Sequence, residues 1–457
     1  MKRKKCLAVL LCSALIACLV TGCSSSSSEG ATSSPEEVSD SLEEAEGNSS
    51  EMKGGNVTWW TWSTEAAEAL NQQVEYAKSN NPNLNIDLQF AATNDYWAKL
   101  PVAIAGGTGP DLYQMTRPSF ELYAASNQTM DLTEIIENSS TIQGYLDSLD
   151  PVLVETYQFG GKQMGIPITV ESTAIAYNKD LLEEAGIDLK AIEDTWTWED
   201  LYDIAEQLTI RNENGETTQY GFYVAADRIP VWEMIWSRGL EIFDETGETC
   251  LFDDPEIVNI LQPLADMYQA GISPNVEVTT QSSGDDMFMS GKIAIVTAGV
   301  WKVPTYTNIT TFDWDVVELP LDSVTGERKS SSNVLGLIIN PNTKNLDATI
   351  ALIEQLVQPD CQKIYADTNN AIPALESVRS NYFEKDVPEN IEAFANALSY
   401  VHPNVLSQYI PYQQFSELQN EFLKKGYSGE VTMEEMLKSL CAEINKVVAE
   451  NVAQFNG

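Results

Sequence analysis

The most constraining feature of this sequence is a regular alternation of strand-like and helix-like segments that begins at residue 57. The segment 57–62, Val-Thr-Trp-Trp-Thr-Trp, is rich in β-branched and aromatic residues and is typical of a strand. Apolar residues then recur at helical spacing, and the segment 84–90 alternates apolar and polar residues as a half-buried strand does. A further helix and the strand 112–115 follow. This order of elements predicts an α/β fold with mainly parallel sheets.

Helix-start signals recur along the chain. Thr197 and Asp200 have the spacing of a capping box, and Asp95 is positioned to cap a helix that runs toward residue 106. The last helix has the clearest pattern, because Thr432 and Glu435 form a capping box ahead of an apolar stripe. That stripe consists of Met436, Leu440, Ile444, Val447 and Val448.

The first 22 residues predict a signal for secretion. Basic residues at 2–5 precede an apolar run from 7 to 20, which is shorter than the roughly 20 apolar residues that span a bilayer. The run ends in Val-Thr-Gly before Cys23, which resembles the bacterial lipobox and implies acylation at Cys23. Cys18 fits the pattern more loosely, and the serines that follow Cys23 favour Cys23. We therefore expect a lipid-anchored protein at the extracellular face of the bacterial cytoplasmic membrane.

Residues 23–53 separate this anchor from the first predicted strand. They are mainly Ser, Glu, Asp and Gly with almost no large apolar side chain, so we expect a disordered tether. About 400 residues follow, which exceeds the ~250–300 residues at which a single hydrophobic core tends to split. The sequence therefore predicts two lobes.

The charge balance and the scarcity of histidine exclude several functions. The chain has 68 Asp and Glu against 26 Lys and Arg, a net charge of −42 that becomes −46 without the four cations of residues 1–22. So acidic a chain repels nucleic acid and anionic membrane surfaces. His402 is the only histidine, which removes most histidine metal sites and the Ser-His-Asp and Cys-His catalytic systems. We expect no cofactor, no metal and no catalytic residue.

Three cysteines remain once the signal segment and Cys23 are set aside: Cys250, Cys361 and Cys441. Their number is odd, and no Cys-x-x-Cys pair is present. The sequence therefore does not favour a disulfide framework, and we interpret the three as small buried apolar residues.

Short motifs are spread in order over nearly the whole predicted globular part. They include Gly-Thr-Gly-Pro-Asp-Leu at 107–112, Gly-Lys-Gln-Met-Gly-Ile-Pro at 161–167 and Tyr-Asn-Lys-Asp at 177–180. Further motifs are 57–62, 197–201, 290–295, 299–301 and 371–374. The ordered set resembles the extracellular solute-binding proteins of ABC importers, in the sugar-binding family 1 that includes maltose-binding protein.

The resemblance implies a two-lobe periplasmic-binding-protein-like fold of class II, with a hinge and a small-molecule ligand in the cleft. The first lobe is expected to comprise 54–168 and 335–382, and the second 171–331 and 388–457. It further implies a monomer that closes on a sugar and delivers it to two permease subunits and their ATPase. A ligand drives such closure by binding the closed state more tightly than the open state.

Aromatic side chains are the expected platforms for a sugar, because the C–H faces of sugar rings stack on flat aromatic surfaces. Trp301 matches a family aromatic and is the leading candidate. Trp62 ends the predicted strand 57–62 and Ser63 follows it, at the end where open α/β sheets place their ligands. Three aromatics of the second half complete the set: Trp236, Tyr409 and Tyr412.

Polar side chains are expected to bind the sugar hydroxyls. Glu171 matches a hinge-proximal acid of the family, Asn333 lies at a predicted crossing between lobes, and Arg117 offers a planar guanidinium. The segment 115–118, Met-Thr-Arg-Pro, lacks the tryptophan and the acid–arginine pair of maltose-binding protein, which speaks against maltose. The remaining candidates are Met115, Asp227 and Arg228.

Two alternatives stay open. The same receptor role is compatible with a polyamine, a glycerol phosphodiester or ferric iron, although iron sites favour His or clustered Tyr and phosphate sites favour several Arg or a helix N-terminus. A secreted carbohydrate-active enzyme would use paired carboxylates. However, the sequence has no glycosidase motif, no Gly-x-Ser-x-Gly elbow and no metal signature.

Overall fold

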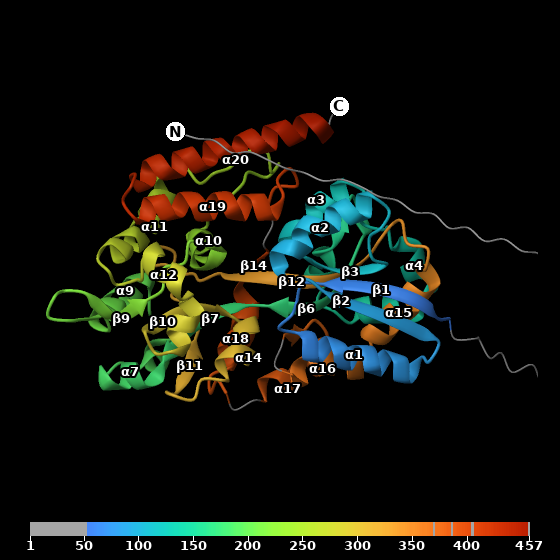
Figure 1. The fold of residues 1–457 in the computed structure, drawn as a ribbon, viewed down its shortest axis with the longest axis horizontal. Coiled ribbons are helices and arrows are strands. Elements are labelled where there is room, and N and C mark those ends of the chain that lie inside the picture. The colour runs from blue at the N-terminus through green and yellow to red at the C-terminus, as the bar shows by residue number, and fades with distance from the viewer. Residues whose placement is uncertain (1–52, 369–370, 385–386, 404–405, 456–457) are drawn as a thin grey trace, which may run out of the picture. The chain divides into compact units, whose positions relative to one another are not determined.

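A computed structural model of the protein describes residues 53–368, 371–384, 387–403 and 406–455 (Figure 1). The predicted signal segment, the anchor Cys23 and the tether up to residue 52 lie outside these described residues. The strands form two principal sheets and one short hairpin of β4 (Gln158–Phe159) and β5 (Lys162–Gln163).

The first sheet has seven strands in the order β13-β6-β12-β3-β1-β2, with β14 pairing with β12. Every residue of the interior strand β6 is buried, whereas the edge strand β2 begins with alternating buried and exposed residues. An interior strand is covered on both faces, so it loses the alternation that predicted β2 from the sequence. The strands are β1 (Gly55–Thr61), β2 (Leu84–Phe90), β3 (Leu112–Thr116), β6 (Ile166–Glu171), β12 (Ser330–Ile339), β13 (Ile372–Pro373) and β14 (Val401–Pro403).

The second sheet has five strands in the order β11-β7-β10-β9-β8. Its interior strand β7 is buried at every residue, as β6 is in the first sheet. The strands are β7 (Thr173–Asn178), β8 (Ile210–Arg211), β9 (Thr217–Phe222), β10 (Ile293–Gly299) and β11 (Trp314–Val317).

Strand pairing is mixed, which corrects the expectation of mainly parallel sheets. The pairs β1–β2, β1–β3, β12–β14 and β9–β10 are parallel. In contrast, β12 runs antiparallel to both β3 and β6, and β7 runs antiparallel to both β10 and β11. The strands β8 and β9, and β13 and β6, are also antiparallel pairs. Of the parallel pairs, β1–β2 and β1–β3 are the ones that the alternating pattern near the N-terminus predicts.

Helices cover the faces of both sheets (Figure 1). Those of the first-sheet region are α1 (Ala67–Asn80), α2 (Thr93–Ala105), α3 (Arg117–Ala125), α4 (Thr133–Asn138), α5 (Ser140–Asp147), α6 (Pro151–Glu155), α15 (Leu346–Leu356), α16 (Pro359–Asp367) and α17 (Ser380–Phe383). The second-sheet region begins with α7 (Lys179–Glu184), α8 (Leu189–Ile192), α9 (Trp198–Gln207), α10 (Arg228–Ser237), α11 (Pro255–Gln269), α12 (Val276–Gln281), α13 (Gly284–Met289) and α14 (Val303–Tyr306). It ends with α18 (Glu392–Ala397), α19 (Tyr412–Tyr427) and α20 (Met433–Phe455). Within the described ranges, no helix has the length and apolarity that a membrane crossing requires.

Two of the predicted helix starts are confirmed and one is shifted. Thr197 and Asp200 form the reciprocal hydrogen bonds of a capping box ahead of α9. Thr432 and Glu435 do the same ahead of α20. Helix α2 already begins at Thr93, so Asp95 lies in its first turn rather than at its cap. Its carboxylate is favourable there because the amino end of a helix carries partial positive charge.

The chain passes between the two sheets at points where neighbouring segments bond to one another. Strand β6 ends at Glu171 and β7 begins at Thr173. The Thr173 backbone N–H donates to Ser330 Oγ over 2.9 Å, and the Val300 N–H donates to the Ser172 carbonyl over 3.0 Å. The first bond ties this passage to the start of β12, and the second ties it to the residue that follows β10. The residue boundaries proposed for the two lobes stay a prediction.

Candidate ligand-binding site

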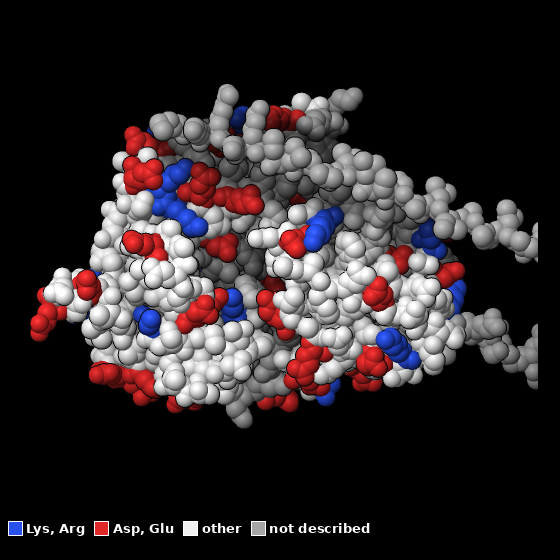
Figure 2. All heavy atoms as spheres, in the orientation of Figure 1, with Lys and Arg blue, Asp and Glu red and all other residues white. Residues whose placement is uncertain are grey.

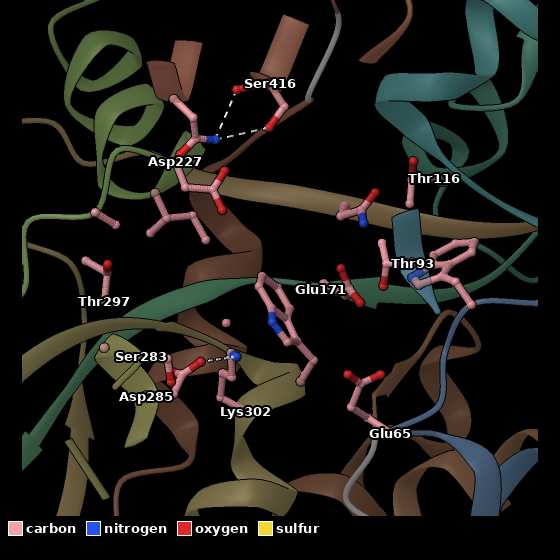
Figure 3. A pocket seen from close by; sticks show the side chains of 18 of the residues that line it. Glu65, Thr93, Thr116, Glu171, Asp227, Ser283, Asp285, Thr297, Lys302 and Ser416 are labelled. Carbon is pink, nitrogen blue, oxygen red and sulfur yellow. Dashed lines mark hydrogen bonds and ion pairs between the residues drawn. The ribbon is translucent and has the colours of Figure 1, made fainter. Parts of the chain in front are cut away.

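A cavity of about 800 Å³ is lined by residues from both sheet regions. The face shown in Figure 2 is hollowed near its centre, and Asp and Glu side chains gather around the hollow. Figure 3 shows Thr93 and Thr116 on one side of the cavity and Asp227, Ser283 and Asp285 on the other. A ligand that fills this cavity would therefore contact both lobes at once.

The first-sheet wall of the cavity is built at strand ends. Trp62 and Ser63 follow β1, Thr116 ends β3, and Glu171 ends β6, and all of them line the cavity. Asn333 of β12 is paired in register with Glu171 and also lines the cavity. Its Oδ1 is buried without a hydrogen-bond partner among the described residues, so it can accept a hydrogen bond from a ligand. Ligands of open α/β sheets commonly bind beyond the carboxyl ends of the strands, and the residues that end or follow β1, β3 and β6 lie at such ends.

Two predicted residues of this wall, Met115 and Arg117, do not line the cavity. Side chains alternate along a strand, so Gln114 and Thr116 of β3 face the cavity while Met115, which is 0% exposed, points into the core. Arg117 is buried at the start of α3, where its Nη2 lies 2.7 Å from Glu121 Oε1 and its guanidinium lies over the Phe120 ring. This ion pair holds the guanidinium within its own helix.

Three aromatic rings form a cluster on the same wall. The Trp62 ring lies 5.2 Å from that of Tyr96 and 5.0 Å from that of Trp97, measured between centroids. Trp62 is half-buried, and both Trp62 and Trp97 line the cavity. Tyr96 is buried and donates its hydroxyl hydrogen bond to the Gln114 carbonyl over 2.6 Å. The cluster therefore fixes the orientation of Trp62 by packing.

Trp301 is the main aromatic of the opposite wall, and Gly299 positions its ring. The indole lies directly over the Gly299 backbone, where a Cβ would come within 2.0 Å of two indole carbon atoms. Only glycine permits this approach. Trp301 is half-buried and lines the cavity, so part of its surface is available to a ligand.

Carboxylates line both walls of the cavity. Figure 3 shows Glu65 and Glu171 with Asp227 and Asp285, and a dashed line that marks the ion pair between Asp285 and Lys302. Asp285 also accepts a hydrogen bond of 2.6 Å from the Tyr306 hydroxyl. Carboxylate oxygens accept hydrogen bonds strongly, so these groups are suited to bind ligand hydroxyls.

Tyr223 lines the cavity, and its hydroxyl feels the charge of two of these acids. Burial raises the pKa of Tyr223, and the negative charges of Asp285 and Asp227 raise it further. The hydroxyl therefore stays protonated at neutral pH and can donate a hydrogen bond to a ligand oxygen.

Of the candidate residues predicted in the second half of the chain, some line the cavity and others do not. Tyr412, the first residue of α19, lines the cavity. Trp236 does not: it is 2% exposed, stacks on His402 with centroids 4.2 Å apart and meets Trp232 edge-on, so it belongs to the core. Tyr409 does not line the cavity either and packs against the core of the second lobe. The side chain of Arg228 lies outside the described part of the chain.

Sequence reasoning missed several residues that line the cavity: Glu65, Thr93, Trp97, Tyr223, Asp285 and Lys302. The strand-end rule would have found Tyr223, which directly follows β9. Trp97 sits on an amphipathic helix, where the helical pattern equally indicates packing. The described residues hold no cluster of three or more His, Cys, Asp or Glu side chains suited to a metal ion.

The sequence also matches a described protein family. Residues 53–395 match the family described as bacterial extracellular solute-binding protein, which is most of the chain. The arabinooligosaccharide-binding protein of Halalkalibacterium halodurans is 25% identical over 256 residues, 54% of this chain and 54% of that protein. The maltooligosaccharide ABC transporter solute-binding lipoprotein of Streptococcus pneumoniae serotype 4 is 25% identical over 48% of this chain and 51% of that protein. The alignments thus span about half the length of these curated relatives.

A solved structure shares the fold over a greater length. The ABC substrate-binding protein of Listeria monocytogenes, solved in complex with cycloalternan, superimposes with a TM-score of 0.77 at 24% identity. The match covers 87% of this chain and 99% of that one. At this identity the likeness confirms the predicted two-lobe α/β fold.

Proposed function

This chain belongs to the bacterial extracellular solute-binding proteins, and from that premise we propose that it captures a carbohydrate between its two lobes for an ABC importer. In this proposal it acts as a monomer, held at the extracellular face of the membrane by lipid on Cys23. Its partners are two permease subunits and their ATPase. It binds its ligand without chemical turnover. The lobes comprise 54–168 with 335–382, and 171–331 with 388–457.

One observation carries the choice of a carbohydrate: indole rings and carboxylates from both lobes line the same cavity. A sugar ring has C–H faces that stack on indole and hydroxyls at its edge that need hydrogen-bond acceptors. Trp62 and Trp301 would supply the stacking surfaces. The proposed ligand-binding residues are Trp62, Ser63, Glu171, Asp227, Trp301, Asn333 and Tyr412, all of which line the cavity. Sugar ligands are also named for the relatives and for the solved structure.

A thermal-shift screen against mono- and oligosaccharides tests the proposal, because a ligand that binds only the folded state raises Tm. Arabino- and maltooligosaccharides are the first probes, followed by titration calorimetry of each compound that raises Tm. Spermidine and glycerophosphodiesters serve as the competing ligand classes. A shift with these and none with any sugar would contradict the proposal, and so would release of shorter sugars during incubation.

Variants of the second wall test the site itself. We expect Trp301→Ala to weaken sugar binding by about 10–100-fold, the loss typical of a buried aromatic anchor. Gly299→Ala should also weaken binding, because the new methyl group displaces the indole ring. Tyr76→Ala on α1, away from the cavity lining, is the control and should keep the wild-type affinity. Unchanged affinity in Trp301→Ala would contradict the role of this residue.

A further inference from the structure

Two of the three cysteines in the described residues, Cys250 and Cys441, meet inside the second lobe. Their Sγ atoms lie 3.0 Å apart, and each side chain is only 2% exposed. Cys250 closes the antiparallel hairpin that precedes α11, by a bridge to Phe243, and Cys441 lies on α20. Cys361 is also buried but belongs to the other hydrophobic core.

The backbone around the pair is already held in position. The Cys250 N–H donates a 2.7 Å hydrogen bond to Asn445 Oδ1, one helical turn along α20 from Cys441. Cys441 Sγ also lies 3.2 Å from the Cys250 carbonyl oxygen. The hairpin and the helix therefore face each other with their sulfur atoms in contact, and little movement separates this geometry from a covalent bond.

We propose that Cys250 and Cys441 form a disulfide bond outside the cell, and that this bond clasps α20 to the second lobe. Extracellular proteins fold in an oxidising environment, where thiols in contact become disulfides. The sequence alone did not favour this outcome, because an odd number of cysteines without a short-range motif gives no pairing. The structure shows which cysteines meet: Cys250 and Cys441 are in contact although 191 positions separate them in the sequence.

The reaction balances with an external organic disulfide as the oxidant. One cysteine thiolate attacks that disulfide, forms a mixed disulfide and releases one small thiol. The second cysteine thiolate then attacks the mixed disulfide, forms the Cys250–Cys441 bond and releases the second small thiol. Two S–H bonds of the protein are lost, the oxidant is reduced to two thiols, and these thiols take up the two protons.

The bond would form while the chain folds rather than afterwards. Burial raises the pKa of the Cys250 thiol, and its contact with Cys441 raises it further, so Cys250 holds little thiolate in the folded protein. The thiolate is the reactive form. Once made, the buried disulfide is shielded from reductants and closes a loop of nearly 200 residues, which restricts the unfolded chain strongly.

Peptide mapping tests the bond directly. The full chain is unfolded and refolded with oxidised glutathione, alkylated with iodoacetamide, and digested without reduction. We expect one cross-linked species that joins the peptides of Cys250 and Cys441 and is lighter by two hydrogen atoms than their sum. Cys361 should be recovered alkylated. Recovery of Cys250 and Cys441 as alkylated thiols, or a cross-link through Cys361, overturns the proposal.

Thermal unfolding of protein refolded with oxidised glutathione, compared with protein refolded with dithiothreitol, tests the clasp. Reduction should lower Tm of the wild type and of Cys361→Ala by several degrees, on the order of 5 °C. Cys250→Ala and Cys441→Ala should show no such dependence. An equal response to the reductant in all four proteins overturns the clasp.

Discussion

At the scale of single residues, Asp111 shows how a family motif acts through structure. It is the fifth residue of the motif 107–112, and its buried carboxylate accepts hydrogen bonds from the Thr58 N–H, Thr58 Oγ1 and Thr343 Oγ1 within 2.9 Å. Asn345 Nδ2 lies 3.2 Å away. Burial alone raises the pKa of Asp111, but these hydrogen bonds outweigh it, so the pKa lies below its ordinary value. The carboxylate joins β1, β3 and the segment after β12.

We expect Asp111→Asn to destabilise the protein by about 1–3 kcal/mol at pH 7, because an amide places a donor against several donors. The lowered pKa makes the Asp111 contribution complete above about pH 4, and it is lost as the pH falls toward the folded-state pKa. The wild type should therefore lose more stability than the variant between pH 4 and pH 2. Urea unfolding at each pH measures this difference, with the exposed Asp194→Asn as the control. Parallel pH profiles for wild type and Asp111→Asn would contradict the assignment.

Several predicted site residues reach the cavity where a motif and an element boundary coincide, and their role in binding stays a prediction. Trp62, Glu171 and Trp301 line the cavity, and each had both a family match and a position at an element boundary. Met115 does not line the cavity because successive side chains of a strand point to opposite faces of the sheet. The motif does not tell which of these faces a given residue takes. Trp236 failed because helical spacing is the same for a core residue and for a ligand contact.

At the scale of elements, Tyr157 packs against β12 at the point where the pairing of β12 with β6 is irregular. The Tyr157 hydroxyl oxygen lies 2.6 Å from the Met115 carbonyl and 2.7 Å from the Val334 carbonyl, so it bridges β3 and β12. Its ring packs over Gly336, where a Cβ would come within 2.4 Å of the ring. The glycine lies where the register of β12 against β6 shifts.

Gly336→Ala should therefore destabilise the protein by about 1–3 kcal/mol, the range for overpacking a filled core. Gly144→Ala is the matched control, since it lies within α5 with no atom near the new methyl group. Alanine favours helix over glycine, so the control should be neutral or more stable by up to about 1 kcal/mol. Chemical unfolding gives both values, and equal effects at the two sites would contradict the packing account.

Element prediction was strongest where side chains cap helices and weakest where they pack across the chain. Capping boxes placed the starts of α9 and α20 correctly because they involve residues three apart. The antiparallel course of β12 depends instead on β3 and β6, which lie more than 150 residues earlier in the chain. Local periodicity carries no information about that pairing.

At the scale of the whole molecule, the two walls of the cavity predict closure. A sugar that contacts Trp62 on one wall and Trp301 on the other stabilises the closed form in proportion to its preference for that form. The sugar identified by thermal shift should therefore reduce the radius of gyration in small-angle scattering. Trp301→Ala at the same sugar concentration should keep the radius of the unliganded protein. An unchanged radius in the saturated wild type would contradict closure.

The two-lobe architecture was predictable from chain length together with the ordered motifs, and the shared fold confirms it. The shape of the cavity was not, because α12, α13 and α19 bring residues 276–285 and 412–424 to it without any local signal. The disposition of helices around a cleft is a property of long-range packing.

Strand β12 connects the passage between the two sheets to the wall of the cavity. Its first residue, Ser330, bonds to the backbone where the chain leaves one sheet for the other, and three residues later Asn333 borders the cavity. A ligand that bonds to Asn333 would therefore act on the same strand that is tied to this passage. Any contact with Asn333 that is stronger in the closed form than in the open form would therefore favour closure, even for a small solute.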